Sequence, residues 1–366
     1  MAHDWSPSIE RLNASYAGET PDRVPCMMWI DESVGSRISG LTVREMLTSS
    51  KKLAAISLDV YEYLGMDNLW LLTGPYLGPH EGVAIARANG KDDKIVWNHY
   101  WAPSIREGTL CQTEKDIENL QIPDHTKVEP WPTILEALVI NREKTGMEPA
   151  LNLSLTWSNI QILRGSQAYI DVIENPDLLL KLCNKIYESQ FDYYKAYCKI
   201  VGEPSLWLNA QYGFNAHMLR FEDAWKFEGQ FVARFCKETG LPLYIHNCGF
   251  KPYWYETIDR LREEGCSVIG VNGSYPKDLD FWVEFRKTYP DIHIMGAAIS
   301  VNAEMEHGSA EDVEEIVKEN ILKLASQGRF IICPLCCVPW RVPLSNIRAV
   351  LAATEKYGKY PIANVS

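Results

Sequence analysis

Short apolar runs recur along the chain, and most of them are separated by longer stretches whose apolar residues follow helical spacing. The runs are rich in branched and aromatic side chains: VPCMMWI, DNLWLL, ALNLSL, SLWLNA, LPLYIH, SVIGV, IHIMGA and RFIIC. Buried strands that alternate with helices pair in parallel. Eight such runs therefore predict an α/β fold, a (β/α)8 TIM barrel with helices at its N-terminus.

Two of the intervening stretches show the helical pattern clearly. Residues 42–65 open with a capping box, in which Thr42 is followed by Glu45, and predict a helix. Residues 310–328 predict a second helix, because their apolar residues lie three and four positions apart before a terminal glycine. Residues 1–23 predict a helical extension ahead of the first strand.

One stretch breaks the alternation of strands and helices. Residues 82–108 read as an antiparallel excursion that turns at Asn89-Gly90, a dipeptide favoured in tight hairpins. We interpret this stretch as an insertion beside the mouth of the barrel. The chain contains no Ser/Gly-rich linker and no repeat of fixed period, so we expect residues 1–366 to form a single domain.

The bulk composition narrows the range of partners and compartments. The chain has 36 basic and 48 acidic residues, a formal net charge of −12, which disfavours nucleic acids and anionic membranes as partners. The first residues lack the pattern of a secretion signal, and no apolar run approaches the about 18 residues of a membrane span. We expect a cytoplasmic protein, which could assemble as a homodimer, whose ten cysteines are thiols or metal ligands.

A His-x-Cys pattern at the end of one run, followed about 90 residues later by a cysteine cluster, has the makings of a zinc site. Residues two apart in a strand point the same way, so His246 and Cys248 would lie side by side. Cys336 supplies a third soft ligand, with Cys333 or Cys337 as an alternative. Three ligands and an open position describe a catalytic zinc, whereas a fourth ligand such as Cys333 would make the site structural. The spacing alone also fits ordinary buried side chains.

Barrel enzymes carry their active sites at the C-terminal ends of the strands, which directs attention to the residues there. Aromatic side chains at these ends could form slots for a ring or a methylammonium group, and neutral amides could hydrogen-bond a phenol, methoxy or carboxylate group. We expect no obvious carboxylate pair at this mouth. The predicted substrate-binding residues are Trp29, Asn152, Trp157, Asn209, Tyr212 and Asn272.

Three segments resemble the uroporphyrinogen decarboxylase superfamily, and specifically its cobalamin-linked methyltransferase branch. ERLNASYAGETPDRVP resembles the opening of that branch, a short helix followed by a Pro-Asp-Arg-Val-Pro entry to the first strand. IHNCG resembles its His-x-Cys-Gly zinc motif, and IICPLCCVPWRVPLSNIRAV resembles its closing Pro-x-Cys segment. The likeness is clearest over residues 240–355 and weak through residues 31–150.

This resemblance implies an activity. It makes His246, Cys248 and Cys336 the zinc ligands of a corrinoid-dependent methyltransferase, similar to the methylcobalamin:coenzyme M methyltransferases and to the methyltransferase components of aryl-ether O-demethylases. In such systems a separate corrinoid protein brings the cobalamin. The implied reaction moves a methyl group between a small methylated substrate and that cobalamin. A methoxyaromatic donor is slightly favoured, and a methylcobalamin:thiol methyltransferase is the alternative.

A divergent decarboxylase of the uroporphyrinogen type is a further alternative, which the sequence fits less well. The decarboxylases carry an arginine-bearing segment after the first strand, whereas PCMMWIDESVG has no arginine before Arg37. They also carry an aspartate after the second strand, where LLTGP has no acid. A tetrapyrrole laden with carboxylates needs cations, and these are missing. The sequence also departs from the pattern of the methyltransferase branch, because Asn272 stands where many relatives have an acid after the next strand, which implies a different polar partner in the pocket.

Overall fold

The computed structural model describes residues 3–71, 77–99, 101–106, 110–273 and 275–362. Its strands are β1 (Trp29–Ile30), β2 (Ile95–Val96), β3 (Ser104–Ile105), β4 (Leu151–Leu153), β5 (Trp207–Ala210), β6 (Leu243–His246), β7 (Val268–Asn272), β8 (His293–Met295), β9 (Phe330–Ile331) and β10 (Cys337–Val338). Its helices in the first half are α1 (Ser6–Ala17), α2 (Glu32–Ser39), α3 (Val43–Met46), α4 (Ser50–Leu64), α5 (Leu77–Ala88), the 3-10 turn η1 (Asp92–Lys94), α6 (Glu114–Glu118), α7 (Trp131–Thr145), α8 (Thr156–Arg164), α9 (Gln167–Glu174) and α10 (Pro176–Ile200). Those in the second half are α11 (Phe221–Ala224), the π-helical turn η2 (Trp225–Gly229), α12 (Gln230–Thr239), α13 (Trp254–Glu263), α14 (Leu279–Thr288), α15 (Glu304–His307), α16 (Ala310–Leu324) and α17 (Leu344–Tyr357).

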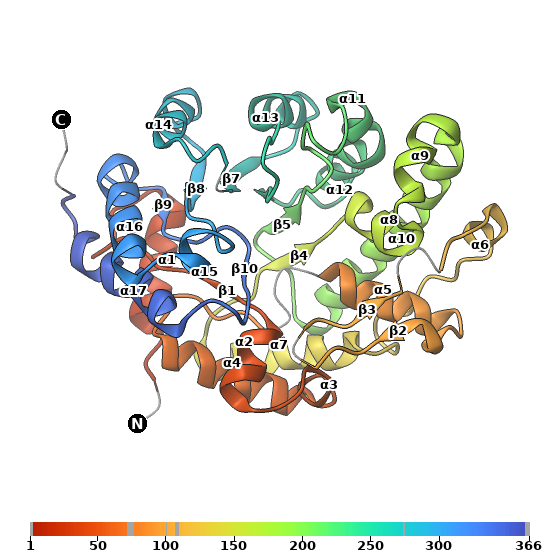
Figure 1. Cartoon of the computed structure of the whole chain (residues 1–366), viewed down its shortest axis with the longest axis horizontal. Coiled ribbons are helices and arrows are strands. Elements are labelled where there is room, and N and C mark those ends of the chain that lie inside the picture. The colour runs from red at the N-terminus through yellow and green to blue at the C-terminus, as the bar shows by residue number, and fades with distance from the viewer. Residues whose placement is uncertain (1–2, 72–76, 100, 107–109, 274, 363–366) are drawn as a thin grey trace.

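Six strands form the main wall of the barrel. β4, β5, β6, β7, β8 and β9 are hydrogen-bonded in this order, and every neighbouring pair is parallel. The spatial order follows the chain because at least one helix lies between each strand and the next, and Figure 1 shows these helices around the strands. Alternation of strand and helix along the sequence thus produces the predicted parallel arrangement.

The first strand extends the wall beside β9. Cys26 forms a parallel bridge with Ile332, just after β9, and β1 pairs in parallel with β10. In that pair Trp29 lies opposite Cys337. The segment that holds the cysteine cluster is therefore adjacent to the end of the first strand, although about 300 residues separate them along the chain.

The predicted second strand, DNLWLL, is not assigned as a strand over residues 67–71, and Leu72 lies outside the described residues. This segment lies beside the first strand. The Asp67 N–H donates to the Cys26 carbonyl at 2.9 Å. The Asn68 amide bonds both the N–H and the carbonyl of Met28, at 3.0 and 2.8 Å. A side chain thus replaces part of the backbone pairing that a regular strand would make.

Alternation along the strands divides their side chains between the barrel lumen and the helix layer. On the side of the barrel wall that faces the helices, Trp207 of β5 packs against Phe235 of α12, with ring centroids 4.4 Å apart. These features, with the parallel order of the strands, confirm the predicted TIM-type α/β barrel. The lumen cluster consists of Met27, Trp29, Leu208, Tyr244, Met295, Ile331, Cys333 and Cys337, together with Leu12 of α1.

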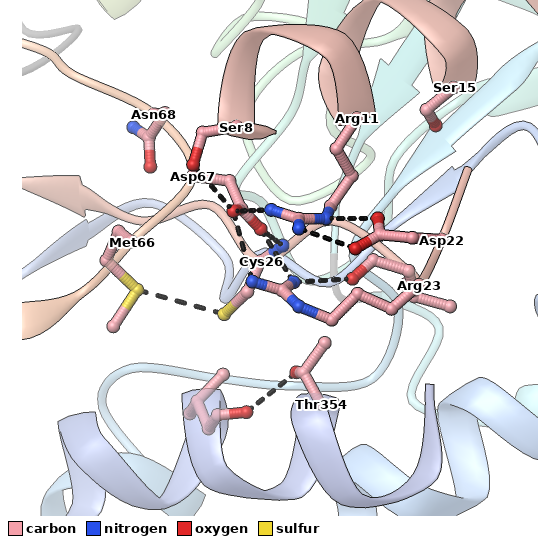
Figure 2. A network of polar contacts seen from close by, with 12 residues as sticks. Ser8, Arg11, Ser15, Asp22, Arg23, Cys26, Met66, Asp67, Asn68 and Thr354 are labelled. Atoms are coloured by element: carbon pink, nitrogen blue, oxygen red, sulfur yellow. Dashed lines mark hydrogen bonds and ion pairs between the residues drawn. The ribbon is translucent and has the colours of Figure 1, made fainter. Parts of the chain in front are cut away.

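A buried polar network fastens α1, the predicted N-terminal helix, to the start of the first strand (Figure 2). Asp67 accepts hydrogen bonds from Arg11 of α1, from Arg23 and from the backbone N–H of Cys26. Arg11 also pairs with Asp22 at 2.7 Å. Asp22 and Arg23 belong to the PDRVP segment that carries part of the family resemblance. That segment therefore has a structural role at the amino end of the barrel.

The first part of the predicted antiparallel excursion is helical. Residues up to Ala88 belong to α5, and Gly90, with φ at +65°, follows the end of that helix instead of forming a hairpin turn. A short antiparallel hairpin comes later, where Ile95 of β2 lies opposite Ile105 of β3. Residues 83–86 are all buried, so consecutive apolar positions resembled a strand. Residues 100 and 107–109 of this stretch lie outside the described part.

The helix predictions hold with one interruption. The capping box of Thr42 and Glu45 is confirmed, but it starts the short α3, and Ser49 caps a separate helix, α4. Serine and threonine side chains favour helix starts over helix interiors, which explains the break at residues 47–49. The predicted helix at 310–328 is α16. Across the ranges that the structure describes, no helix is both long and apolar enough to cross a membrane.

Candidate metal centre

His246, Cys248 and Cys336 come together at the C-terminal end of the barrel strands. His246 is the last residue of β6, Cys248 follows it closely, and Cys336 directly precedes β10. One nitrogen and two sulfur atoms of these side chains all lie within 4.8 Å of one another. Tetrahedral zinc, with bonds of about 2.3 Å to sulfur and about 2.1 Å to nitrogen, spaces its ligands roughly 3.5 Å apart. Small side-chain rotations would therefore enclose an ion.

The His246 ring is oriented by two neighbours. Its Nδ1 lies 2.6 Å from Oδ1 of Asn272 on β7, and the Asn272 amide donates to the Met295 carbonyl at 2.8 Å. The Trp29 ring meets the imidazole edge-on, with centroids 4.8 Å apart. Because the Asn272 Oδ1 atom can only accept a hydrogen bond, His246 Nδ1 carries the hydrogen and His246 Nε2 keeps its lone pair. His246 Nε2 is buried and has no hydrogen-bond partner among the described residues, as expected for a metal-binding nitrogen.

The two thiols suit a soft divalent cation. The Cys336 thiol and burial raise the pKa of Cys248 well above its ordinary value, because two thiolates at this distance repel each other. A cation between them would remove that repulsion. One imidazole and two thiols form a donor set typical of zinc. Cys336 also adopts the left-handed backbone conformation, with φ at +66°, which costs about 1–3 kcal/mol and is most often retained at functional sites.

The other two candidate cysteines belong to the lumen cluster. The Cys333 thiol lies 3.5 Å from the carbonyl oxygen of Pro334, and Cys337 pairs with Trp29 in the β1–β10 ladder. Burial raises the pKa of both thiols. Among the described residues, the candidate ligand atoms that lie close together belong to His246, Cys248 and Cys336, and not to Cys333 or Cys337. The geometry therefore favours Cys336 as the third ligand, and this assignment stays a prediction.

Three of the predicted substrate-binding residues adjoin the candidate metal ligands His246, Cys248 and Cys336, which we call the metal group. Trp29 contacts His246 and also the Trp70 ring, at a centroid distance of 5.6 Å. Burial and the charge of Cys248 raise the pKa of Tyr212, which places its half-buried phenol near that thiol. Both polar atoms of Asn272 are already engaged, so this residue holds the imidazole in place.

The other three predicted substrate-binding residues have different neighbours. Asn209 Oδ1 accepts a hydrogen bond from the Leu155 N–H at 3.3 Å. Trp157 is fully buried in α8, with its ring centroid 5.4 Å from that of Tyr169. Asn152, in the middle of β4, lines a cavity of about 270 Å³ that also contacts α1. Their proposed contacts with a substrate stay predictions.

A pair of buried carboxyl groups follows β1, which corrects the expectation that the mouth carries no carboxylate pair. Asp31 is 6% exposed and Glu32 is 3% exposed. The Glu32 carboxylate lies 3.2 Å from Nε2 of His80, which is fully buried. The signal in the sequence was the acidic dipeptide at a strand exit. His80 could not be paired with it in advance, because it lies on α5, about 50 residues further along the chain, and no local pattern links the two segments.

Comparisons with known proteins agree with this architecture. The model of the uroporphyrinogen decarboxylase family matches residues 7–357. A methyltransferase from Methanosarcina mazei has the same fold, with a TM-score of 0.73 and 18% sequence identity; the match covers 96% of this chain and 98% of that one. No curated protein matches the chain by sequence. Because the family match spans nearly the whole barrel, this chain belongs to the uroporphyrinogen decarboxylase family.

Proposed function

We propose that this protein is a zinc-dependent methyltransferase that moves a methyl group between a small methylated substrate and the cobalamin of a separate corrinoid protein. A methoxyaromatic substrate is slightly favoured. The meeting of His246, Cys248 and Cys336 at the mouth of the barrel carries the proposal, because three nitrogen and sulfur donors leave one zinc position open for a substrate. The family and the methyltransferase with the same fold support it.

The chain supplies positioning around this centre. A zinc ion held by the three residues would act as a Lewis acid, either polarising an ether oxygen or holding a thiol as its thiolate. Asn272 and Trp29 fix the imidazole. Trp29, Trp70 and Tyr212 offer aromatic faces for a ring. Transfer of a methyl group by in-line displacement depends mainly on such positioning.

Two alternatives make different predictions. A methylcobalamin:thiol methyltransferase would use the same zinc centre with a thiol as the methyl acceptor. A divergent decarboxylase would need no metal and would bind its carboxylates through cations. The first arginine after β1, Arg37, donates from Nη1 to the backbone carbonyls of Trp340 and Val342, whereas its buried Nε and Nη2 have no hydrogen-bond partner among the described residues.

Metal analysis tests the zinc centre directly. Protein purified without chelators is expected to hold about one zinc per chain, and His246→Ala and Cys336→Ser are expected to lose it. Cys333→Ser is the matched control, because Cys333 is an equally buried thiol in the same segment outside the group, and it should keep the metal. Wild type without zinc, or equal loss in all three variants, would remove the basis of the proposal.

An assay of methyl transfer then selects the substrate. Wild-type protein is incubated with cob(I)alamin and a panel of methoxyaromatics and methylamines, and with methylcobalamin and a panel of thiols. We expect turnover of at least one methoxyaromatic, which the zinc-free variants lack. Turnover of thiols alone would select the alternative direction. Loss of carbon dioxide from a carboxylate by the metal-free variants would select the decarboxylase.

A further inference from the structure

A carboxyl group stands at the end of β1 on the lumen side of the barrel. Trp29 belongs to the lumen cluster, whereas Ile30 belongs to the core beneath the helices. Asp31 continues the extended backbone, with φ at −92° and ψ at 176°. Alternation therefore returns Asp31 to the lumen side, one step beyond Trp29 toward the mouth. Because Trp29 contacts the His246 ring, Asp31 lies at the same end of the barrel as the metal group.

One oxygen of Asp31 is fixed, and the other is not. Oδ1 accepts hydrogen bonds from the backbone N–H groups of Ser33 and Val34, at 2.9 and 3.3 Å, and from the Ser33 hydroxyl. Among the described residues, no hydrogen bond reaches Oδ2. Ser33 also accepts from the Trp340 N–H at 3.0 Å, which ties the start of α2 to the segment after β10. The carboxyl group is thus oriented and keeps one oxygen for another partner.

The surroundings of Asp31 favour its neutral form. Burial and the neighbouring Glu32 carboxylate raise the pKa of Asp31 to about 7, against the opposing effect of the Ser33 and Val34 hydrogen bonds. Glu32 itself is turned toward His80. A carboxylic acid that keeps its proton near neutral pH can donate it, and barrel enzymes place such groups at strand ends.

We propose that Asp31 is the general acid of the methyl transfer and delivers its Oδ2 proton to the departing oxygen of a methoxyaromatic substrate. This inference rests on the proposed function and names one catalytic residue of it. The expelled group is a phenolate, which leaves more easily when a proton reaches it as the bond breaks. A proton donor at this position suits an oxygen-bound methyl donor better than an incoming thiol, which would have to lose a proton instead.

The step balances in atoms and electrons. The bond between the ether oxygen and the methyl carbon breaks, and its electron pair stays on the oxygen. The methyl carbon forms its new bond with a reduced corrinoid, which supplies the electron pair of that bond. The oxygen takes the proton from Asp31 and leaves as a phenol, and solvent later returns a proton to the Asp31 carboxylate.

Leaving-group dependence tests this role. Asp31→Asn is compared with wild type on 2-methoxyphenol, whose phenolate leaving group is the more basic, and on 4-nitroanisole, whose nitro-substituted leaving group is the less basic. We expect turnover of 2-methoxyphenol to fall by about 10²-fold or more, the range of a lost general acid, and turnover of 4-nitroanisole to fall less than about tenfold. A merely structural role for Asp31 would lower both rates by the same factor, and that result would overturn the inference.

Two controls keep the outcome interpretable. Asp278→Asn removes another aspartate that caps a helix, α14, but from an exposed position, and it should leave both rates unchanged. The wild type provides a test that needs no variant: turnover of 2-methoxyphenol should slow in heavy water, whereas turnover of 4-nitroanisole should not. Absence of this difference would overturn the general-acid role. Inactivity of wild type toward every methyl donor would instead overturn the proposed function.

Discussion

Asp67 concentrates the polar contacts that join the N-terminal helix to the barrel. Its carboxylate is 1% exposed and accepts hydrogen bonds from Ser8, Arg11, Arg23 and the Cys26 N–H. Both arginine side chains are also largely buried, at 9% and 11% exposure. Asp67 therefore compensates the positive charges of both arginines, and Asp22 also pairs with Arg11.

Asp67→Asn should destabilise the protein by about 3–5 kcal/mol, because the buried Arg23 guanidinium loses its counter-charge and that of Arg11 keeps only the exposed Asp22. Urea unfolding of wild type and variant measures the difference in the free energy of unfolding. Asp22→Asn is the control, since the Asp22 side chain is 66% exposed and its pair with Arg11 should contribute no more than about 1 kcal/mol. Similar losses for the two variants would contradict this account.

Asn272 should govern metal affinity without being a ligand. Asn272→Leu removes the acceptor for His246 Nδ1–H, and we expect zinc affinity to drop by about 10–100-fold, because the imidazole loses its fixed tautomer and orientation. Asn272→Asp keeps an acceptor oxygen and should bind at least as tightly as wild type. Competition with a chromophoric chelator gives both affinities. Unchanged affinity in Asn272→Leu would show that Trp29 alone orients the ring.

At the scale of elements, one buried network holds three helices together. Glu81 of α5 accepts hydrogen bonds from His125 at 3.0 Å, from Trp131 of α7 at 2.9 Å, and from Ser189 of α10. The second ring nitrogen of His125 pairs with Asp192 of α10 at 2.9 Å. Burial lowers the pKa of His125, but the Glu81 carboxylate and the hydrogen bonds to Asp192 and Glu81 outweigh this effect and raise the pKa to about 9.

This pKa makes the network sensitive to alkaline pH. The folded pKa lies above the unfolded value of about 6.5, so the contribution of His125 is fully present below pH 6.5 and disappears as the pH rises through about 9. Wild type should lose up to about 3 kcal/mol more stability than His125→Gln between pH 6.5 and 9.5. Urea unfolding of both proteins at the two pH values measures this difference in the free energy of unfolding. Parallel pH profiles would show that His125 is neutral in the fold.

The elements also show what could be predicted from sequence. Strands β4 to β9 followed from apolar runs, and His246 and Cys248 were placed at a strand exit by the two-residue period. Burial of residues 83–86 on several sides erases helical spacing, so their sequence pattern predicts an extended segment where the structure has a helix. The partnership of Glu32 with His80 depends on packing between segments about 50 residues apart, and local patterns carry no information about such a contact.

Across the whole molecule, the candidate metal centre joins distant parts of the barrel wall. His246 ends β6 and Cys248 follows that strand, whereas Cys336 lies between β9 and β10. In the sheet order, β7 and β8 stand between β6 and β9. A shared ion would therefore tie the middle of the wall to the segment that pairs with the first strand. That all residues from 1 to 366 form one domain stays a prediction, and such a tie would strengthen it.

Zinc should consequently stabilise the entire fold. A ligand that binds only the folded state raises the free energy of unfolding by about 2.7 kcal/mol when its free concentration is 100 times the dissociation constant. Thermal unfolding of chelator-treated protein, with and without added zinc, should show a clear upward shift of the midpoint. Cys333→Ser should retain the shift, whereas His246→Ala should lose it, because its site lacks the imidazole nitrogen. An equal shift in His246→Ala would place the stabilising zinc elsewhere in the molecule.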